Sequence, residues 1–112
     1  MIHGIYSARF MSNNNLVGAG IVVIDGASLH GGDFDYLYKG KYRLFDTKMS
    51  ATVDVENYTG KPHSILGPLK SFRLTLNGVT APHGFSLSGA VDGQPNLMIR
   101  IELTKISELV DQ

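Results

Sequence analysis

The sequence predicts an all-β fold, an antiparallel up-and-down barrel of about eight strands that forms a single domain over residues 1–112. Three observations predict it. Short alternations of apolar and polar residues recur along the chain, turn residues separate them at hairpin spacing, and no stretch has a helical period. Such spacing is typical of a sandwich or a barrel, and closure into a barrel removes the exposed strand edges that favour aggregation. We therefore expect a barrel rather than a sandwich.

Each predicted strand is a stretch of alternation that ends at residues favouring a turn. The strands are expected, in order, at residues 4–12, 16–24, 27–30, 36–44, 49–56, 72–76, 85–91 and 97–104. The turns between them are expected at residues 13–15, 25–26, 31–32, 45–48, 77–78 and 92–93, which are rich in Asn, Asp and Gly. Four Gly and Pro residues interrupt residues 59–71, so this segment is expected to be an irregular loop that covers an opening of the core. Residues 106–112 are expected to form a helical turn or a frayed end.

The second predicted strand, residues 16–24, is apolar on both faces. A strand of this kind is covered on both sides, or it packs against a second chain. Homodimers commonly bury an apolar patch, and a two-fold pair is the most frequent oligomer. We therefore predict a homodimer, and the predicted interface residues are Val17, Ala19, Ile21 and Val23. Coverage by the loop at residues 59–71 is the alternative.

The central predicted strand, residues 36–44, has one aromatic face and one basic face. Its aromatic residues belong to a larger inward-facing set, which comprises Tyr6, Phe10, Tyr36, Tyr38, Tyr42, Phe72 and Phe85. These side chains either fill the core or line a lumen that binds a small hydrophobic ligand, with tyrosine hydroxyls as polar groups for orientation. From the alternation we expect Tyr38, Phe72, Leu87 and Ile101 to be inside together.

The composition excludes several classes of protein. Ten basic and ten acidic residues cancel and the pI is about 6.9, whereas a domain that binds duplex DNA usually has a strong basic excess. The absence of cysteine excludes disulfides and thiolate chemistry and fits a reducing compartment. The amino terminus lacks the pattern of a signal peptide, and no apolar run is long enough to span a bilayer. We expect a cytoplasmic protein that binds neither nucleic acid nor membrane directly.

The sequence contains one cluster that could suggest a metal site or acid–base chemistry, formed by His30, Asp33 and Asp35. Both aspartates are next to glycines at a predicted turn, where Asp commonly accepts hydrogen bonds from nearby backbone. We interpret them as turn residues. Neither a serine in a nucleophile elbow nor a glycine-rich phosphate loop is present. We therefore expect no catalytic residues, no metal, no cofactor and no enzymatic activity.

Several short motifs occur in a characteristic order over nearly the whole chain. They are Gly4-Ile5-Tyr6-Ser7, Phe10-x-Ser12-Asn13, Gly18-x-Gly20-Ile21, Gly31-Gly32-Asp33, Tyr38-x-Gly40, Pro62-x-Ser64-x-Leu66 and Phe72-x-Leu74. In order and spacing the chain resembles the GrlR-like family of negative regulators of bacterial type III secretion. The resemblance implies a small lipocalin-like barrel that dimerises and restrains a helix-turn-helix transcription activator in the bacterial cytoplasm.

The chain differs from that family in the charge of one segment. In the family, the segment after the Tyr-x-Gly motif carries an exposed acidic run that recognises the activator. Here the same region is basic, and the predicted partner-binding residues are Lys39, Lys41, Arg43, Asp46 and Lys48. Because surface charge governs partner choice, we predict an acidic patch on the protein partner. A solvated basic face without a partner is the alternative. The function expected first is therefore a regulatory, protein-binding barrel, and the second is a carrier or sensor of a small apolar molecule.

Overall fold

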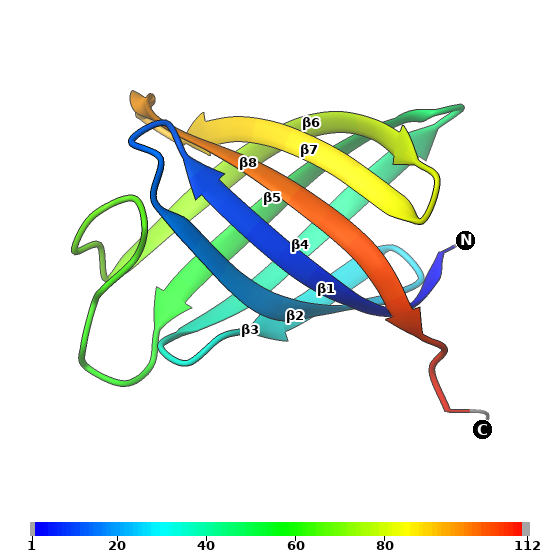
Figure 1. The fold of residues 1–112 in the computed structure, drawn as a ribbon, viewed down its shortest axis with the longest axis horizontal. Coiled ribbons are helices and arrows are strands. Elements are labelled where there is room, and N and C mark those ends of the chain that lie inside the picture. The colour runs from blue at the N-terminus through cyan, green and yellow to red at the C-terminus, as the bar shows by residue number, and fades with distance from the viewer. Residues whose placement is uncertain (1, 111–112) are drawn as a thin grey trace.

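A computed structural model describes residues 2–110 as a closed barrel of eight antiparallel strands (Figure 1). Each strand pairs with its neighbours in sequence, and the last strand pairs with the first. The strands are β1 (His3–Ser12), β2 (Val17–Asp25), β3 (Ser28–Gly32), β4 (Tyr36–Phe45), β5 (Lys48–Asn57), β6 (Ser71–Ala81), β7 (Gly84–Val91) and β8 (Gln94–Ser107). The predicted all-β, up-and-down barrel is confirmed.

The core lies inside the barrel because the side chains of each strand alternate between its two faces. In β5, Met49, Ala51, Val53 and Val55 are buried, and the residues between them are exposed. The same rule buries three of the four residues expected to lie inside together, and the fourth, Phe72, is half-buried and packs against this core. The face assignment from the sequence is therefore correct through the middle of the barrel.

The turn expected at Gly31 and Gly32 was wrong, because both residues belong to β3 and the turn lies at residues 33–35. Gly31 pairs with Val22 of β2, and a Cβ atom at Gly31 would lie 2.1 Å from the carbonyl oxygen of Ile21. The glycine is therefore needed for the close approach of two strands and not for a sharp bend.

The hairpin expected at Asn77 and Gly78 was also wrong, because β6 continues to Ala81 and the turn lies at residues 82–83. In this register Gly78 is opposite Leu87 of β7, and a Cβ atom at Gly78 would lie 1.9 Å from the carbonyl oxygen of Ser86. Close strand packing again explains the glycine. The dipeptide is a strong local turn signal, but pairing with the whole of β7 overrides it.

The alternation of side chains no longer predicts burial where the strands extend beyond the ends of the barrel. Leu44 was expected on the inner face, but its side chain is 43% exposed near the end of β4. At the carboxyl end, β8 continues to Ser107, so the helical turn expected from residue 106 is absent among the described residues. The remaining part of that prediction, residues 111–112, lies outside the described residues.

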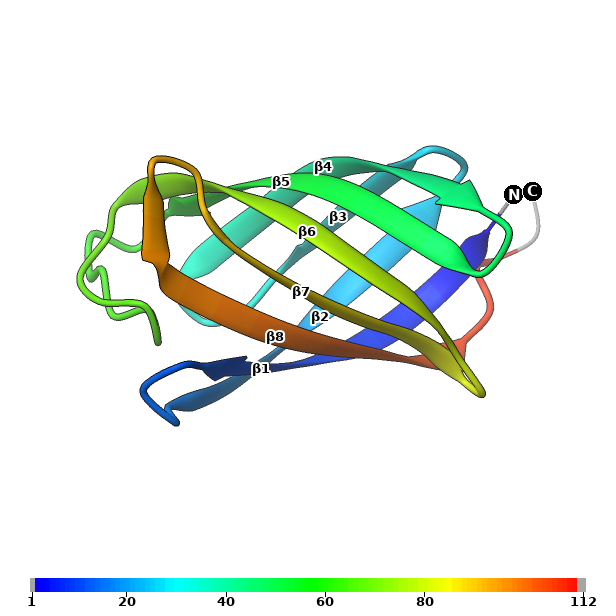
Figure 2. The same cartoon turned by 90° about the horizontal axis from the view of Figure 1, so that it is seen from above.

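The two ends of the barrel differ. The loop between β5 and β6 lies at one end together with the β1–β2, β3–β4 and β7–β8 turns, and both termini lie at the other end (Figures 1 and 2). We call the first end the mouth and residues 58–70 the plug loop. The described residues include no helix of the length and apolarity needed to cross a membrane.

Candidate functional site

The barrel contains a cavity of about 280 Å³ that is open at the mouth. Its inner part is apolar and is lined by core side chains of β5 to β8, among them Val53, Leu76 and Ile101. Its outer part is lined by the start of β2, the β3–β4 turn and the plug loop. The cavity is therefore an apolar chamber whose entrance is built from three separate segments.

The entrance exists because β2 and β3 differ in length at the mouth. The pairing of β2 with β3 begins at Ile21 and Gly32, so residues 17–20 of β2 have no partner on that side. The chain leaves β3 at Gly32 and turns into β4 at residues 33–35. The barrel wall is therefore incomplete between residues 17–20 and the β3–β4 turn.

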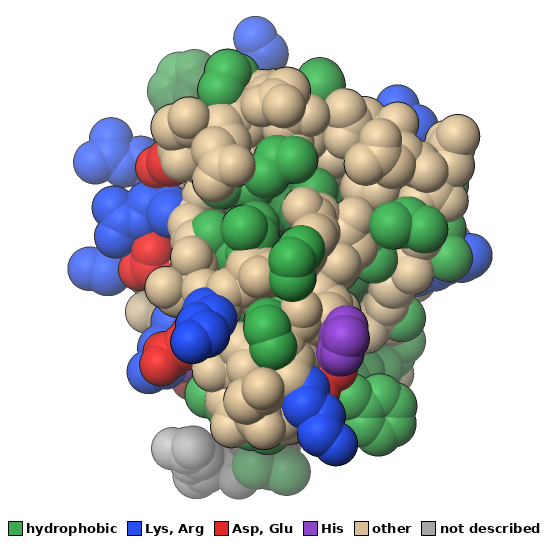
Figure 3. Space-filling view, turned by 90° about the vertical axis from the view of Figure 1, so that its left-hand side faces the viewer, with side chains coloured by type: hydrophobic (Ala, Val, Ile, Leu, Met, Phe, Trp, Pro, Cys, Tyr) green, Lys and Arg blue, Asp and Glu red, His purple; other side chains and the backbone are tan. Residues whose placement is uncertain are grey.

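The plug loop covers this gap, as the sequence predicted. Leu66 is buried, while Ile65 and Leu69 are half-buried against the core. Ile65 packs on β2, since a Cβ atom at Gly18 would lie 3.4 Å from its methyl carbon Cγ2. The face in Figure 3 accordingly shows hydrophobic side chains gathered around the centre of the mouth, with charged groups at the rim.

Hydrogen bonds fasten the plug loop to the β3–β4 turn. The Tyr58 backbone N–H donates to the carbonyl oxygen of Asp35 (3.0 Å), and the Thr59 hydroxyl donates to the carboxylate of Asp35 (2.8 Å). At the far end of the loop, the Tyr36 hydroxyl donates to the carbonyl oxygen of Leu69 (2.6 Å). The loop is thus held at both ends by residues of the turn and of β4.

Asp33 is the polar centre of the entrance. The backbone N–H groups of Asp35 and Tyr36 donate to its Oδ1 atom (2.9 and 2.8 Å), and the Tyr38 hydroxyl donates to its Oδ2 atom. Burial, reinforced by the neighbouring Asp33 carboxylate, raises the pKa of Tyr38. The hydroxyl therefore remains a hydrogen-bond donor to Asp33. The sequence analysis identified Asp33 as a turn residue but missed its position in the cavity lining.

Gly20 explains why Tyr38 can reach Asp33. A Cβ atom at Gly20 would lie 2.9 Å from the Tyr38 hydroxyl oxygen and 2.9 Å from the carbonyl oxygen of Gly32. The tyrosine ring therefore lies directly against the backbone of β2. The absence of a side chain at Gly20 therefore permits the close approach of Tyr38 to β2.

The predicted lumen aromatics divide between the two ends of the barrel. Phe10, Tyr36, Tyr38 and Phe72 line the cavity near the mouth. The other three, Tyr6, Tyr42 and Phe85, are not part of its lining. Tyr6 and Phe85 pack with ring centroids 5.9 Å apart, and the Tyr42 hydroxyl donates to the carbonyl oxygen of Gly26 in the β2–β3 turn. The second group fills the end opposite the mouth.

The predicted partner-binding residues lie on the outside of the barrel. Lys39, Lys41 and Arg43 are exposed at alternate positions of β4, and we call them the basic strip. Asp46 and Lys48 are exposed beyond the strip, at the tip of the β4–β5 hairpin. Asp46 has a positive φ of 56°, so its position is set by the turn. Phe45 is 78% exposed beside it.

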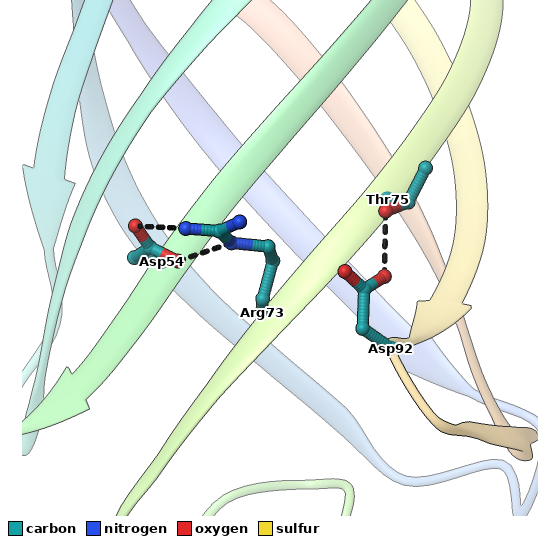
Figure 4. Close-up of polar contacts among 4 residues, drawn as sticks. All are labelled: Asp54, Arg73, Thr75 and Asp92. Carbon is teal, nitrogen blue, oxygen red and sulfur yellow. Dashed lines mark hydrogen bonds and ion pairs between the residues drawn. The ribbon is translucent and has the colours of Figure 1, made fainter.

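The carboxylate nearest to the basic strip in the strand register is bound elsewhere. Asp54 of β5 is directly opposite Lys39, but it accepts two hydrogen bonds from the Arg73 guanidinium of β6 (2.7 and 3.2 Å; Figure 4). These bonds lower the pKa of Asp54. On the same sheet surface, Thr75 donates to Asp92 (2.6 Å). Among residues 2–110, no ion pair involves a residue of the basic strip.

The predicted dimer residues form the outer face of β2. Val17 is 69% exposed and Ile21 is 44% exposed, Ala19 is also exposed, and Val23 is half-buried. Exposed Met11 of β1 lies opposite Val17 and extends this face. The plug loop does not cover these side chains, so an apolar outer strip remains on the described surface.

The structure separates the residues of the candidate metal or acid–base cluster. His30 is exposed on β3, while Asp33 and Asp35 belong to the β3–β4 turn and line the cavity. Within residues 2–110, no three His, Asp or Glu side chains converge in a way that could hold a metal ion. As expected, Asp33 accepts hydrogen bonds from the backbone of its own turn.

The GrlR-like resemblance stays a prediction, because it rests on the order of short motifs alone. No protein-family model matches the chain, and no curated protein matches it significantly.

Proposed function

We propose that this chain is a non-enzymatic regulatory barrel that binds a protein partner on its outer surface, at the basic strip. The proposal rests on one observation: among the described residues, the three cations of the basic strip form no ion pair with an acidic side chain. The cross-strand acid of the strip, Asp54, is bound by Arg73, so three neighbouring cations on a chain of zero formal net charge face solvent together. Such a local field steers a partner of opposite charge and selects against basic surfaces.

The spacing of the strip suggests the shape of the partner. Alternate residues of a strand are about 6.6 Å apart, so the three cations span roughly 13 Å. Acidic side chains one turn apart on a helix, at positions i and i+4, are about 6 Å apart along its axis. An acidic helix lying along β4 therefore fits the strip, and the resemblance points to a helix-turn-helix activator as its source. A cytoplasmic bacterial location belongs to the same proposal.

Charge reversal of the strip tests this function. Immobilised wild-type barrel and the double variant Lys41→Glu, Arg43→Glu are incubated with lysate of the native organism at increasing salt concentrations. Mass spectrometry should identify a partner with an acidic surface that the wild type captures at low salt and releases as salt screens the charges. The double variant should lose that partner. A control with the same charge change, Lys61→Glu with Lys70→Glu in the plug loop, should retain it. Unchanged capture by a folded strip variant would refute the proposal.

A second function is favoured by a different observation, the cavity. An apolar chamber of about 280 Å³ with a polar entrance has the form of a site for a small ligand. We propose that the barrel also takes up a small apolar molecule in the manner of a lipocalin, with the plug loop over the entrance.

A pair of adjacent substitutions tests the cavity. Ala51 is buried in the cavity lining and Thr52 is exposed outside it. Ala51→Leu should fill the chamber and abolish binding of the neutral probe N-phenyl-1-naphthylamine, whereas Thr52→Leu should leave binding unchanged. Equal binding by both variants would place the probe outside the lumen.

We further propose that the outer face of β2 is the interface of a homodimer. Val17 and Ile21 expose a continuous apolar strip with Ala19 between them, and association would remove it from water. Light scattering should give a mass of about twice 12.2 kDa. The variant Val17→Glu, Ile21→Glu should be monomeric, whereas a wild-type monomer at high concentration would refute this assignment.

A further inference from the structure

The described lining of the cavity entrance contains carboxylates and no permanently charged cation. The ionisable side chains of the lining, apart from the buried tyrosines, are Asp33, Asp35 and His63. Neither lysine nor arginine contributes to it. The inner lining consists of aliphatic and aromatic side chains. A molecule in the cavity would therefore have its apolar part inside and its polar part beside two carboxylates.

The Asp33 carboxylate can accept further hydrogen bonds, and no cationic side chain among the described residues forms an ion pair with it. Its bonds come from two backbone N–H groups and one tyrosine hydroxyl, all of which are neutral donors. Asp35 likewise accepts from a neutral donor, the Thr59 hydroxyl. The ion pairs recorded over residues 2–110 include neither aspartate. Each carboxylate can accept further hydrogen bonds, and both lie partly withdrawn from solvent.

This arrangement discriminates between ligand head groups. A carboxylate or phosphate head group would meet like charges in a half-buried site, which raises the free energy of the complex. An ammonium group would form charge-assisted hydrogen bonds with the same two carboxylates. A neutral hydroxyl would lie between these extremes.

The size of the chamber limits the apolar part. An engineered apolar cavity of ~150 Å³ binds benzene, and the chamber here measures about 280 Å³. It therefore suits one short alkyl chain or a small ring system, and not a two-chain lipid.

We propose that the lumen takes a cationic amphiphile, a primary amine with a single short apolar chain or ring, whose ammonium group lies between Asp33 and Asp35. This inference rests on the second proposed function, uptake of a small apolar molecule. It adds the chemical class of that molecule and the residues that select it. The plug loop, which is hydrogen-bonded to Asp35, would close over the bound head group.

Isothermal titration calorimetry with three ligands of equal chain length tests the inference. The full chain is titrated with n-octylamine, n-octanol and octanoate at pH 7 and low salt. We expect octylamine to bind at least ten times more tightly than octanoate, with octanol between them. The double variant Asp33→Asn, Asp35→Asn keeps hydrogen-bonding side chains at both positions, and it should reduce this ratio to about two. The matched control Glu56→Gln, on the outer face of β5, should keep the wild-type ratio.

The outcomes separate the head-group inference from the function on which it rests. Equal affinity for the three ligands, or preference for octanoate, would overturn the inference while leaving lumen binding intact. Binding of none of them would overturn lumen binding and the inference together. If the double variant unfolds, the three wild-type titrations still decide, and Ala51→Leu should abolish the octylamine signal if the amine binds inside.

Discussion

Truncation to alanine should destabilise the barrel by different amounts at two inward-facing residues of β6, Leu76 and Phe72. Truncation of the smaller residue, Leu76, should cost more stability than truncation of the larger one. Leu76 is 1% exposed and lies in the deep core, whereas Phe72 is half-buried near the mouth. Truncation of a well-packed Leu to Ala removes about 2.7–5.0 kcal/mol of stability, and the cost rises with the cavity that remains. We expect Leu76→Ala to cost about 4 kcal/mol.

Phe72→Ala should cost only about 2 kcal/mol, roughly half of the usual 3–5 kcal/mol for a fully buried phenylalanine. Its side chain is only half-buried at the mouth, where its ring lies 6.2 Å from that of Tyr36 (centroid to centroid), so its truncation removes less buried surface than that of Leu76. A free energy of 1 kcal/mol corresponds to about 4 °C in the melting temperature of a domain this size. The expected decreases are therefore about 16 °C for Leu76→Ala and about 8 °C for Phe72→Ala.

Urea denaturation followed by circular dichroism measures both free energies on the same scale. Thr80→Ala, at an exposed position of β6, is the control and should stay within about 0.5 kcal/mol of the wild type. A larger loss for Phe72→Ala than for Leu76→Ala would refute the reasoning, because the phenylalanine would then be the better-packed residue. Little loss for Leu76→Ala would mean that the inner and outer faces of β6 are reversed, a one-residue error in register.

Three further predictions concern single features of the barrel. Gly78→Ala should destabilise it by about 1–3 kcal/mol, measured by urea denaturation, because the new Cβ atom would overlap the Ser86 carbonyl oxygen, which belongs to the backbone and cannot rotate away. Burial raises the pKa values of Tyr6, Tyr36 and Tyr38 in the folded barrel. Because the unfolded chain releases these protons at lower pH than the folded barrel does, the free energy of unfolding should fall as pH rises above about 10. Absorbance at 295 nm should show that these three tyrosines ionise at higher pH in the folded protein than in the unfolded chain. Arg73→Gln should weaken capture of an acidic partner at low salt, because Asp54 becomes available to neutralise Lys39, and an unchanged salt profile would contradict this.

The sequence alone determined the strand content and the inner and outer faces of the strands. These properties follow from the alternation of side chains along each strand, which is local and independent of the partner strand. The same rule predicted the apolar outer face of β2 and the basic strip of β4. It also identified the plug loop, whose glycines and prolines interrupt the alternation while its leucines remain apolar.

Only the tertiary structure decided how the strands are aligned with one another, and the candidate site depends on that alignment. The register of β5 with β6 joins Asp54 to Arg73 and so leaves the basic strip without its nearest acid. The early end of β3 at Gly32 opens the barrel wall and brings Asp33 to the cavity entrance. Local signals missed these features, and they misplaced the turn at Gly78, because register is set by the summed pairing of whole strands and the packing of the shared core.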